Sequence, residues 1–141
     1  MEKVAFLDRN SVKANVRRPS FDHEWVEYNQ TWIDEVVNNL QGVTIALTNK
    51  VPIRKDAIDQ LPDLKLIAMA ATGYDVIDIP ACKERGIGVV NIRNYATNTV
   101  PEHTFSLILA LKRSLVSYRA DVLAGRWQKH DQFYNQMECG V

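Results

Sequence analysis

Residues 70 to 91 read AATGYDVIDIPACKERGIGVVN, and this stretch decides the predicted fold. The apolar run that ends at Ala70 predicts a buried strand, and Thr72-Gly73-Tyr74 predicts a turn. A short helix is expected from Asp78 to Arg85, and a second buried strand from Gly88 to Asn91. A turn of this kind leaves backbone N–H groups unpaired beside a helix start, which suits an anion such as a carboxylate.

The same alternation of strands and helices fills the amino-terminal part of the chain. Further strands are predicted at residues 4–7, 25–28, 43–47 and 64–70, and further helices at residues 31–41 and 55–61. This order implies βαβ units in an open, doubly wound parallel sheet with helices on both faces. Ligands of such α/β sheets bind at the carboxyl ends of the strands. Those ends are Asp8, Thr48 to Lys50, Ala71 to Tyr74, and Asn91 onward.

Residues 99–125 predict one long helix. Thr99 and Glu102 have the spacing of a capping box around Pro101. Phe105 to Leu111 is apolar on almost every side, so this helix must pack against more than one neighbour. A second domain or a second chain is therefore expected there. Residues 126–141 show no periodicity and are interpreted as a linker.

Composition limits the classes of function. Lys plus Arg and Asp plus Glu both number 17, and the resulting net charge of zero argues against a nucleic-acid binder. Cys82 and Cys139 lie far apart without metal-ligand spacing, which favours reduced thiols in a cytoplasmic protein. Met1 to Lys3 lead directly into a strand rather than into a signal peptide. The longest apolar run is too short to cross a membrane.

Helix and turn signals explain several residues that could otherwise be catalytic. Thr31, followed by Asp34, has the pattern of a helix cap, and Gly42 and Gly86 are expected to end their helices. Gly73 could serve only the backbone angles of its turn. The alternative for Gly73, a place in an anion site, stays open.

Charged and titratable residues have similar alternatives. Asp75 and Asp78 are more simply read as caps than as catalytic acids, and Lys50 could attract an anion or simply be solvated. His103 follows Glu102, but adjacent helical residues point apart, so packing explains this histidine better than acid–base chemistry. The chain has no GxGxxG fingerprint, no Gly-x-Ser-x-Gly nucleophile motif and no metal-ligand cluster.

A set of short motifs, each weak alone, occurs in a family-specific order. They are Asn49-Lys50-Val51, Leu64 to Ile67, Ala71 to Asp75 with Ile77-Asp78, Arg85 to Ile87 with Val90-Asn91, and Val100 to Thr104 followed by Leu107 to Leu111. The set resembles the amino-terminal part of the D-isomer-specific 2-hydroxyacid dehydrogenases. Within that family it is most similar to the glycerate dehydrogenase (hydroxypyruvate reductase) branch. Pro101 stands where the family usually has alanine.

The resemblance implies a two-domain oxidoreductase that transfers hydride between NAD or NADP and a small 2-keto acid such as hydroxypyruvate or glyoxylate. Residues 1–98 would be its flavodoxin-like substrate domain, residues 99–125 the crossover helix, and residues 126–141 the linker to a coenzyme domain. The family's dimer contact implies a homodimer through Val100 to Leu123.

Site residues also follow from the resemblance. It assigns the substrate carboxylate to the backbone of Ala71, Thr72, Gly73 and Tyr74. Val51 matches a side wall of the substrate pocket, and Thr72 and Thr97 match positions near the coenzyme.

The resemblance stops short of the family's catalytic machinery. The coenzyme motif, catalytic arginine, supporting glutamate and acid–base histidine of the family would lie downstream of Val141. No catalytic residue is therefore expected in these residues, which are interpreted as a shortened dehydrogenase without activity of its own. An alternative is a non-enzymatic oligomerising or regulatory module derived from this family. A flavin binder is disfavoured, because Asp8 to Ser11 contains no glycine for a phosphate loop.

Overall fold

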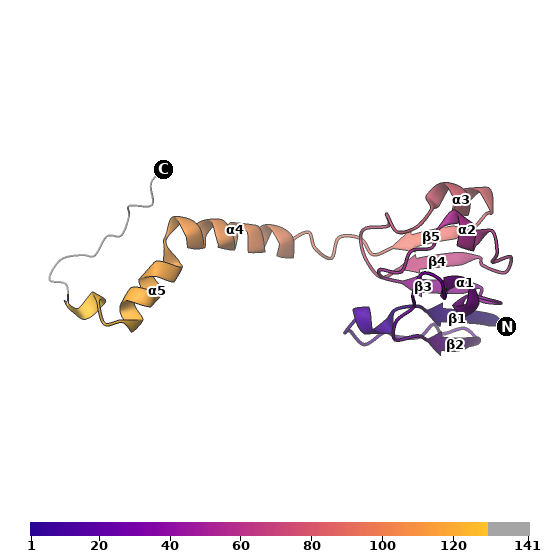
Figure 1. Cartoon of the computed structure of the whole chain (residues 1–141), viewed down its shortest axis with the longest axis horizontal. Coiled ribbons are helices and arrows are strands. Elements are labelled where there is room, and N and C mark those ends of the chain that lie inside the picture. Colours follow the sequence, from indigo (N-terminus) through magenta and orange to yellow (C-terminus); the bar gives the residue numbers. More distant parts are fainter. Residues whose placement is uncertain (130–141) are drawn as a thin grey trace. The chain divides into compact units, whose positions relative to one another are not determined.

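The computed structural model describes residues 1–129, and its first part is built on a five-stranded parallel sheet. Figure 1 shows the strands β1 (Glu2–Phe6), β2 (His23–Glu27), β3 (Ile45–Thr48), β4 (Leu66–Met69) and β5 (Gly88–Asn91). Their order is β2-β1-β3-β4-β5, which is the flavodoxin-like order. The predicted α/β fold with five parallel strands is thereby confirmed. The direction of strand addition reverses between β1 and β3, where doubly wound sheets commonly bind ligands.

Three short helices pack on one face of this sheet: α1 (Val36–Asn39), α2 (Lys55–Ile58) and α3 (Ile79–Glu84). The apolar core joins alternate strand residues to two residues from or next to each helix. These core residues include Ala5, Ala46, Ile67, Val36, Leu40, Ala57, Ile58, Ala81 and Cys82. The connections β2–β3, β3–β4 and β4–β5 all run in the same direction across the sheet, so right-handed crossovers place their helices on the same face.

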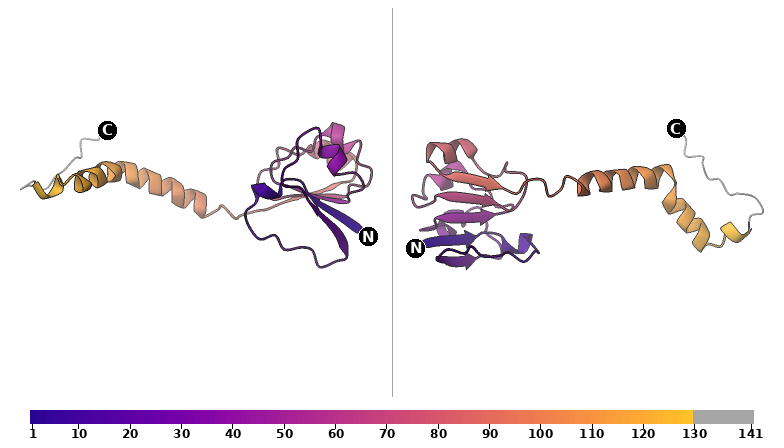
Figure 2. Two further views of the ribbon diagram at one scale, coloured as in Figure 1. Left: turned by 60° about the horizontal axis from the view of Figure 1, so that its bottom comes forward. Right: turned by 180° about the vertical axis from the view of Figure 1, so that it is seen from behind.

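The other face corrects one detail of the predicted fold. The connection from β1 to β2 runs in the opposite direction, and it contains only the short 3-10 turn η1 (Arg9–Ser11). Val12 and Val16 of this connection line an apolar hollow with Phe6, Leu47 and Ala68 of the sheet. Within residues 1–93, helices therefore cover one face and an irregular segment partly covers the other. Figure 2 shows the strands from this second side.

The start of α1 also differs from the prediction, because Thr31 does not cap it. The Thr31 hydroxyl is buried and donates to the Leu7 carbonyl oxygen at 2.6 Å. The side-chain amide of Asn39 donates to the same hydroxyl oxygen at 3.1 Å. Residues 31–35 consequently stay outside the helix, and Trp32 and Ile33 are 64% and 71% exposed.

Residues 94–129 form a second unit with two helices where one was expected. Helix α4 (Thr99–Lys112) and helix α5 (Leu115–Leu123) are separated at Ser114, which has a left-handed φ of 50°. A left-handed residue cannot continue a right-handed helix, so the predicted helix 99–125 is interrupted there. Thr99 is the first residue of α4, and the preceding Asn98 makes no side-chain capping bond, so the predicted capping box is absent.

The second unit exposes much of its apolar surface. Phe105, Leu107, Ile108, Leu109 and Leu111 are each at least half exposed. His103 is also exposed rather than packed in an apolar core. No helix among residues 1–129 is long and apolar enough to cross a membrane. The predictions for Cys139 and for residues 130–141 of the linker fall outside the described residues.

Candidate functional site at the carboxyl edge of the sheet

Asp8 joins the ends of the two strands that flank the reversal point. Its carboxylate is buried and accepts from the backbone N–H of Asn49 at 2.9 Å and of Lys50 at 2.8 Å. The Asn49 side chain reaches back to the Ser11 hydroxyl oxygen at 3.1 Å. Charge-assisted bonds of this kind are stronger than neutral ones. The loops after β1 and β3 are therefore held together by the side chain of Asp8.

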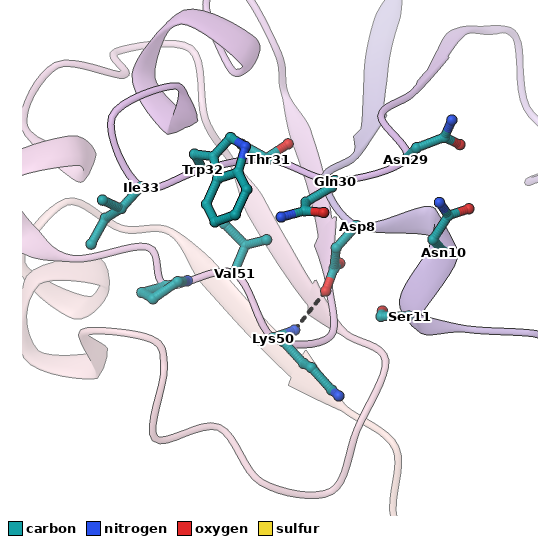
Figure 3. A pocket seen from close by; sticks show the side chains of 11 residues that line it. Asp8, Asn10, Ser11, Asn29, Gln30, Thr31, Trp32, Ile33, Lys50 and Val51 are labelled. Atoms are coloured by element: carbon teal, nitrogen blue, oxygen red, sulfur yellow. Dashed lines mark hydrogen bonds between the residues drawn. The ribbon is translucent and has the colours of Figure 1, made fainter.

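A pocket of about 470 Å³ opens beside Asp8. Figure 3 shows its lining, to which the loops after β1, β2 and β3 all contribute. Asn10, Ser11, Asn29 and Gln30 supply polar groups, whereas Trp32, Ile33, Val51 and Pro52 supply apolar surface. The Lys50 side chain extends away from Asp8, which contacts the backbone of Lys50 instead (Figure 3).

Val51, a predicted wall of the substrate pocket, lies at the base of this loop and is 6% exposed. Its backbone N–H donates to the Thr48 hydroxyl oxygen at 3.0 Å, and that hydroxyl donates back to the Val51 carbonyl oxygen. Thr48 is fully buried, so these two bonds hold Val51 firmly against the end of β3. Val51 lines the pocket of Figure 3.

The predicted anion-binding turn after β4 is attached to the same loop. The N–H of Ile53 donates to the Val76 carbonyl oxygen at 3.1 Å, and the N–H of Asp78 donates to the Ile53 carbonyl oxygen at 3.1 Å. The Arg54 guanidinium adds a bond of 2.9 Å to the Asp75 carbonyl oxygen. The structure therefore ties the loop that carries Val51 to residues 75–78 on the same edge, whereas the pocket lined by Val51 includes none of residues 71–74.

The backbone of this turn has free donors. Within the described part of the chain, the N–H groups of Thr72, Gly73 and Tyr74 have no hydrogen-bond partner. Two carbonyls of the turn are occupied: the N–H of Ile92 donates to the Ala71 oxygen at 3.1 Å, and the Asn91 amide donates to the Thr72 oxygen at 2.7 Å. Exposed, unpaired N–H groups at a strand end are suitable donors to an anion.

Gly73 is not explained by its backbone angles, because its φ is not among the positive values found at Gly42, Gly86 and Gly125. A Cβ atom at this position would lie 3.3 Å from a carboxylate oxygen of Asp75. A side chain at residue 73 would therefore crowd the Asp75 carboxylate. A left-handed turn angle does not explain Gly73, and its place in an anion site stays a prediction.

The remaining residues named in the sequence analysis lie mostly at helix ends. Asp78 caps α3 as predicted, because its carboxylate accepts from the Ala81 N–H at 3.0 Å. Gly86 directly follows the C-cap of α3 with φ of +71° and ends that helix as predicted, whereas Gly42 (φ +69°) lies beyond Leu40, the C-cap of α1. Thr97 is exposed in the turn before α4 and belongs to the second unit. Residues 1–129 contain no cluster of three or more potential metal ligands.

Comparison with known proteins assigns the chain to a family. A model of the D-isomer-specific 2-hydroxyacid dehydrogenase catalytic domain matches residues 4–136. The chain belongs to the D-isomer-specific 2-hydroxyacid dehydrogenase family. The resemblance predicted from the motifs is thereby confirmed.

Two curated members of the 2-hydroxyacid dehydrogenase family match nearly the whole chain. Glycerate dehydrogenase of Methylorubrum extorquens is 57% identical over 133 residues, which are 94% of this chain and 42% of that protein. A putative 2-hydroxyacid dehydrogenase of Haemophilus influenzae is 38% identical over 93% of this chain and 42% of its own length. The chain thus spans about two fifths of the curated relatives that it matches.

Solved structures agree on the fold of this family. An acyclic imino acid reductase, determined with NADPH and D-Arg, matches 97% of this chain and 44% of its own, with 22% identity and a TM-score of 0.73. D-2-hydroxyisocaproate dehydrogenase matches 96% of this chain and 43% of its own, with 17% identity and a TM-score of 0.66. At these identities, the likeness establishes the fold.

The sequence patterns did not assign roles to four residues of this edge. Trp32 and Ile33 line the pocket although residues 31–41 were predicted to be helical. Arg54 and the side-chain amide of Asn91 hold the turn after β4. Asn91 had a signal, because it is polar at the end of an apolar strand, but Arg54 looks like an ordinary surface residue.

Proposed function

We propose that the chain provides the substrate-binding half of an NAD(P)-dependent oxidoreductase that interconverts a small 2-keto acid and its D-2-hydroxy acid. The observation that carries this proposal is the row of unpaired N–H groups at Thr72, Gly73 and Tyr74. Family membership supports it. The names of two relatives, glycerate dehydrogenase and the hydroxypyruvate reductase of Blautia hydrogenotrophica, favour hydroxypyruvate as the keto acid.

In this proposal, the substrate carboxylate accepts hydrogen bonds from the turn, and Ala71 provides the half-buried backbone from which the turn starts. Fixed N–H donors bind an anion without reorganisation, which is why such sites orient substrates well. Val51, in the loop after the neighbouring strand β3, would limit how the rest of the keto acid can lie. The carbonyl carbon is thereby held in one orientation for reduction.

The coenzyme would supply the hydride when bound. Thr72 and Thr97 are both exposed, which fits the proposed approach of each to the coenzyme. The hydroxyl groups of Thr72 and Thr97 are not proposed to distinguish NAD from NADP. We also infer a homodimer through Val100 to Leu123, because large apolar side chains of α4 and α5 are exposed there.

The competing flavin interpretation meets a specific obstacle at the reversal point. The backbone N–H groups of Asn49 and Lys50 already donate to the buried carboxylate of Asp8. A nucleotide phosphate at this position would face that carboxylate instead of free donors. The non-enzymatic alternative is an oligomerising module. It is favoured only by the exposed apolar side chains of α4 and α5, and the graft described below also tests it.

A graft tests the proposal. The 141 residues are joined to the remaining part of the Methylorubrum extorquens glycerate dehydrogenase, to which they are 57% identical. Hydroxypyruvate-dependent oxidation of NADH or NADPH is expected from the graft. A folded graft that binds the coenzyme but reduces neither hydroxypyruvate nor glyoxylate would contradict the proposal.

Two matched variants of the graft locate the activity. Gly73→Pro removes one of the proposed N–H donors, because proline has no N–H, and it is expected to raise KM for hydroxypyruvate strongly. Lys83→Ala changes an exposed residue of α3 and is expected to leave KM unchanged. The 141 residues alone are expected to show no turnover, and measurable turnover would show that acid–base groups are present within them.

A further inference from the structure

The turn after β4 is fixed to β5 by two carbonyl groups that follow each other in the chain. The Ala71 oxygen accepts from the backbone N–H of Ile92 at 3.1 Å, and the Thr72 oxygen accepts from the Asn91 side-chain amide at 2.7 Å. The first bond needs no particular side chain. The second bond exists because residue 91 is an asparagine.

These bonds also determine the direction of the neighbouring N–H groups. The described residues contain no cis peptide bond, and in a planar trans peptide the C=O and N–H point in opposite directions. Since the Ala71 and Thr72 carbonyls face β5, the N–H groups of Thr72 and Gly73 face away from it. Away from β5 is toward β3 in this sheet, and Val51 follows β3.

The peptide plane between Thr72 and Gly73 is the part of the turn that is freest to rotate. Both residues are exposed, so neighbouring side chains do not enclose this peptide. A peptide plane in a turn can rotate between two orientations when the residue after it accepts a positive φ, and glycine does so without steric cost. Gly73 therefore permits an orientation in which its N–H would point toward β5.

We propose that Asn91 is a positioning residue, which donates to the Thr72 carbonyl and thereby directs the Gly73 N–H toward the substrate carboxylate. This inference rests on the proposed function of the turn as a carboxylate site. Without the Asn91 amide, the peptide occupies both orientations, and the apparent affinity for a carboxylate falls in proportion to the competent fraction.

The position of Asn91 makes this role separable from a purely structural one. Asn91 pairs with Met69 through the backbone ladder of β4 and β5, which does not depend on its side chain. The bond from its amide to Thr72 lies at an exposed site. Its removal is therefore expected to change the turn while leaving the sheet folded.

The experiment uses the 141-residue chain labelled with ¹⁵N and titrated with hydroxypyruvate. Wild type is compared with Asn91→Ala, which removes the amide, and Asn91→Asp, which keeps the shape but can no longer donate. Asn38→Asp introduces the same charge change at an exposed position on α1 and is the control. Residual dipolar couplings report the direction of the Gly73 N–H, and urea unfolding reports stability.

Both Asn91 variants are expected to bind hydroxypyruvate about fivefold to tenfold more weakly, with a changed Gly73 coupling and an unfolding midpoint like that of the control. An unchanged Gly73 coupling and unchanged affinity in Asn91→Ala would overturn the proposal. So would a loss of affinity that is matched by general unfolding and spread over all amides.

The failure of the proposed function gives a different result. If the wild-type chain showed no shift of the Thr72, Gly73 and Tyr74 amides with hydroxypyruvate, the carboxylate site itself would be contradicted. The Gly73 couplings of wild type and Asn91→Ala would still decide whether Asn91 directs this peptide.

Discussion

Single polar side chains hold the carboxyl edge of the sheet together at the residue scale. Asp8 spans from β1 to the loop after β3, and Thr31 ties the segment after β2 to the end of β1. Both side chains are buried, whereas Asn49 and Lys50, the partners of Asp8, are half-buried and exposed. The loops that line the pocket depend on these two residues rather than on helices.

Asp8→Ala is expected to lower the free energy of unfolding by about 1–3 kcal/mol, because it removes two charge-assisted hydrogen bonds to the backbone N–H groups of Asn49 and Lys50. Asp8→Asn retains one acceptor oxygen and is expected to lose less. Asp63→Ala at an exposed position is the control, with an expected change within about 0.5 kcal/mol. Urea denaturation measures the stability of all three variants. Equal stability of wild type and Asp8→Ala would contradict the role of Asp8 in joining the loops after β1 and β3.

Cys82 makes stability depend on alkaline pH. Burial, and to a smaller extent the negative charge of Asp78, raise the pKa of its thiol. The unfolded thiol ionises first, near about pH 8.5, while the folded thiol still holds its proton. This contribution to stability is therefore complete below the unfolded pKa and is lost as the pH rises toward the folded pKa.

Cys82→Ala is expected to lose less stability than wild type as the pH rises above about 8.5, since the ionising group is gone. Its absolute stability is expected to be lower at every pH, because the buried side chain leaves a cavity. The quantity to compare is therefore the slope of unfolding free energy with pH. Identical slopes would mean that the folded and unfolded thiols titrate alike.

At the element scale, Gly86 in the left-handed conformation ends α3, one of the helices that cover the sheet. A Cβ atom at Gly86 would meet nothing within 4 Å, so only its φ of +71° opposes another residue. Gly86→Ala is expected to cost about 1–2 kcal/mol of unfolding free energy. Gly86→Asn is expected to cost less, because asparagine adopts this conformation more readily. If chemical denaturation showed Gly86→Ala to be more stable than Gly86→Asn, this explanation would be contradicted.

Element boundaries show how far sequence patterns reach. The positions of β1, β3 and β4 followed from apolar runs, because central parallel strands need apolar side chains over most of their length. The start of α1 did not, because the Thr31 hydroxyl bonds to Leu7, which is distant in sequence. The break at Ser114 was equally hidden, since nothing in its immediate sequence requires a left-handed residue.

At the scale of the whole molecule, the candidate site is a property of topology more than of any motif. The loop that carries Val51 and the turn at residues 71–76 follow the neighbouring strands β3 and β4, whose carboxyl ends share an edge. The edge was therefore predictable from strand order. The orientation of the Thr72–Gly73 peptide was not, because it depends on one side-chain bond between two such ends.

The second unit supplies the last prediction, which concerns association. Leu111 and Val116 are 76% and 82% exposed and line an apolar hollow between α4 and α5. Contiguous apolar surface of this kind marks an interaction site, and the chain is expected to be dimeric at micromolar concentration. Leu111→Glu and Val116→Glu are expected to give monomers, since a charge would have to be buried at the contact.

Ile33→Glu provides the matched control for that experiment, because Ile33 is 71% exposed but lies in the first unit. This variant is expected to remain dimeric if association runs through α4 and α5. Sedimentation or light scattering after size exclusion distinguishes the cases. A monomeric wild-type chain would contradict the proposed homodimer, and self-association would then not explain the exposed apolar side chains of α4 and α5. Equal loss of dimer in all three variants would place the contact on a wider surface than these helices.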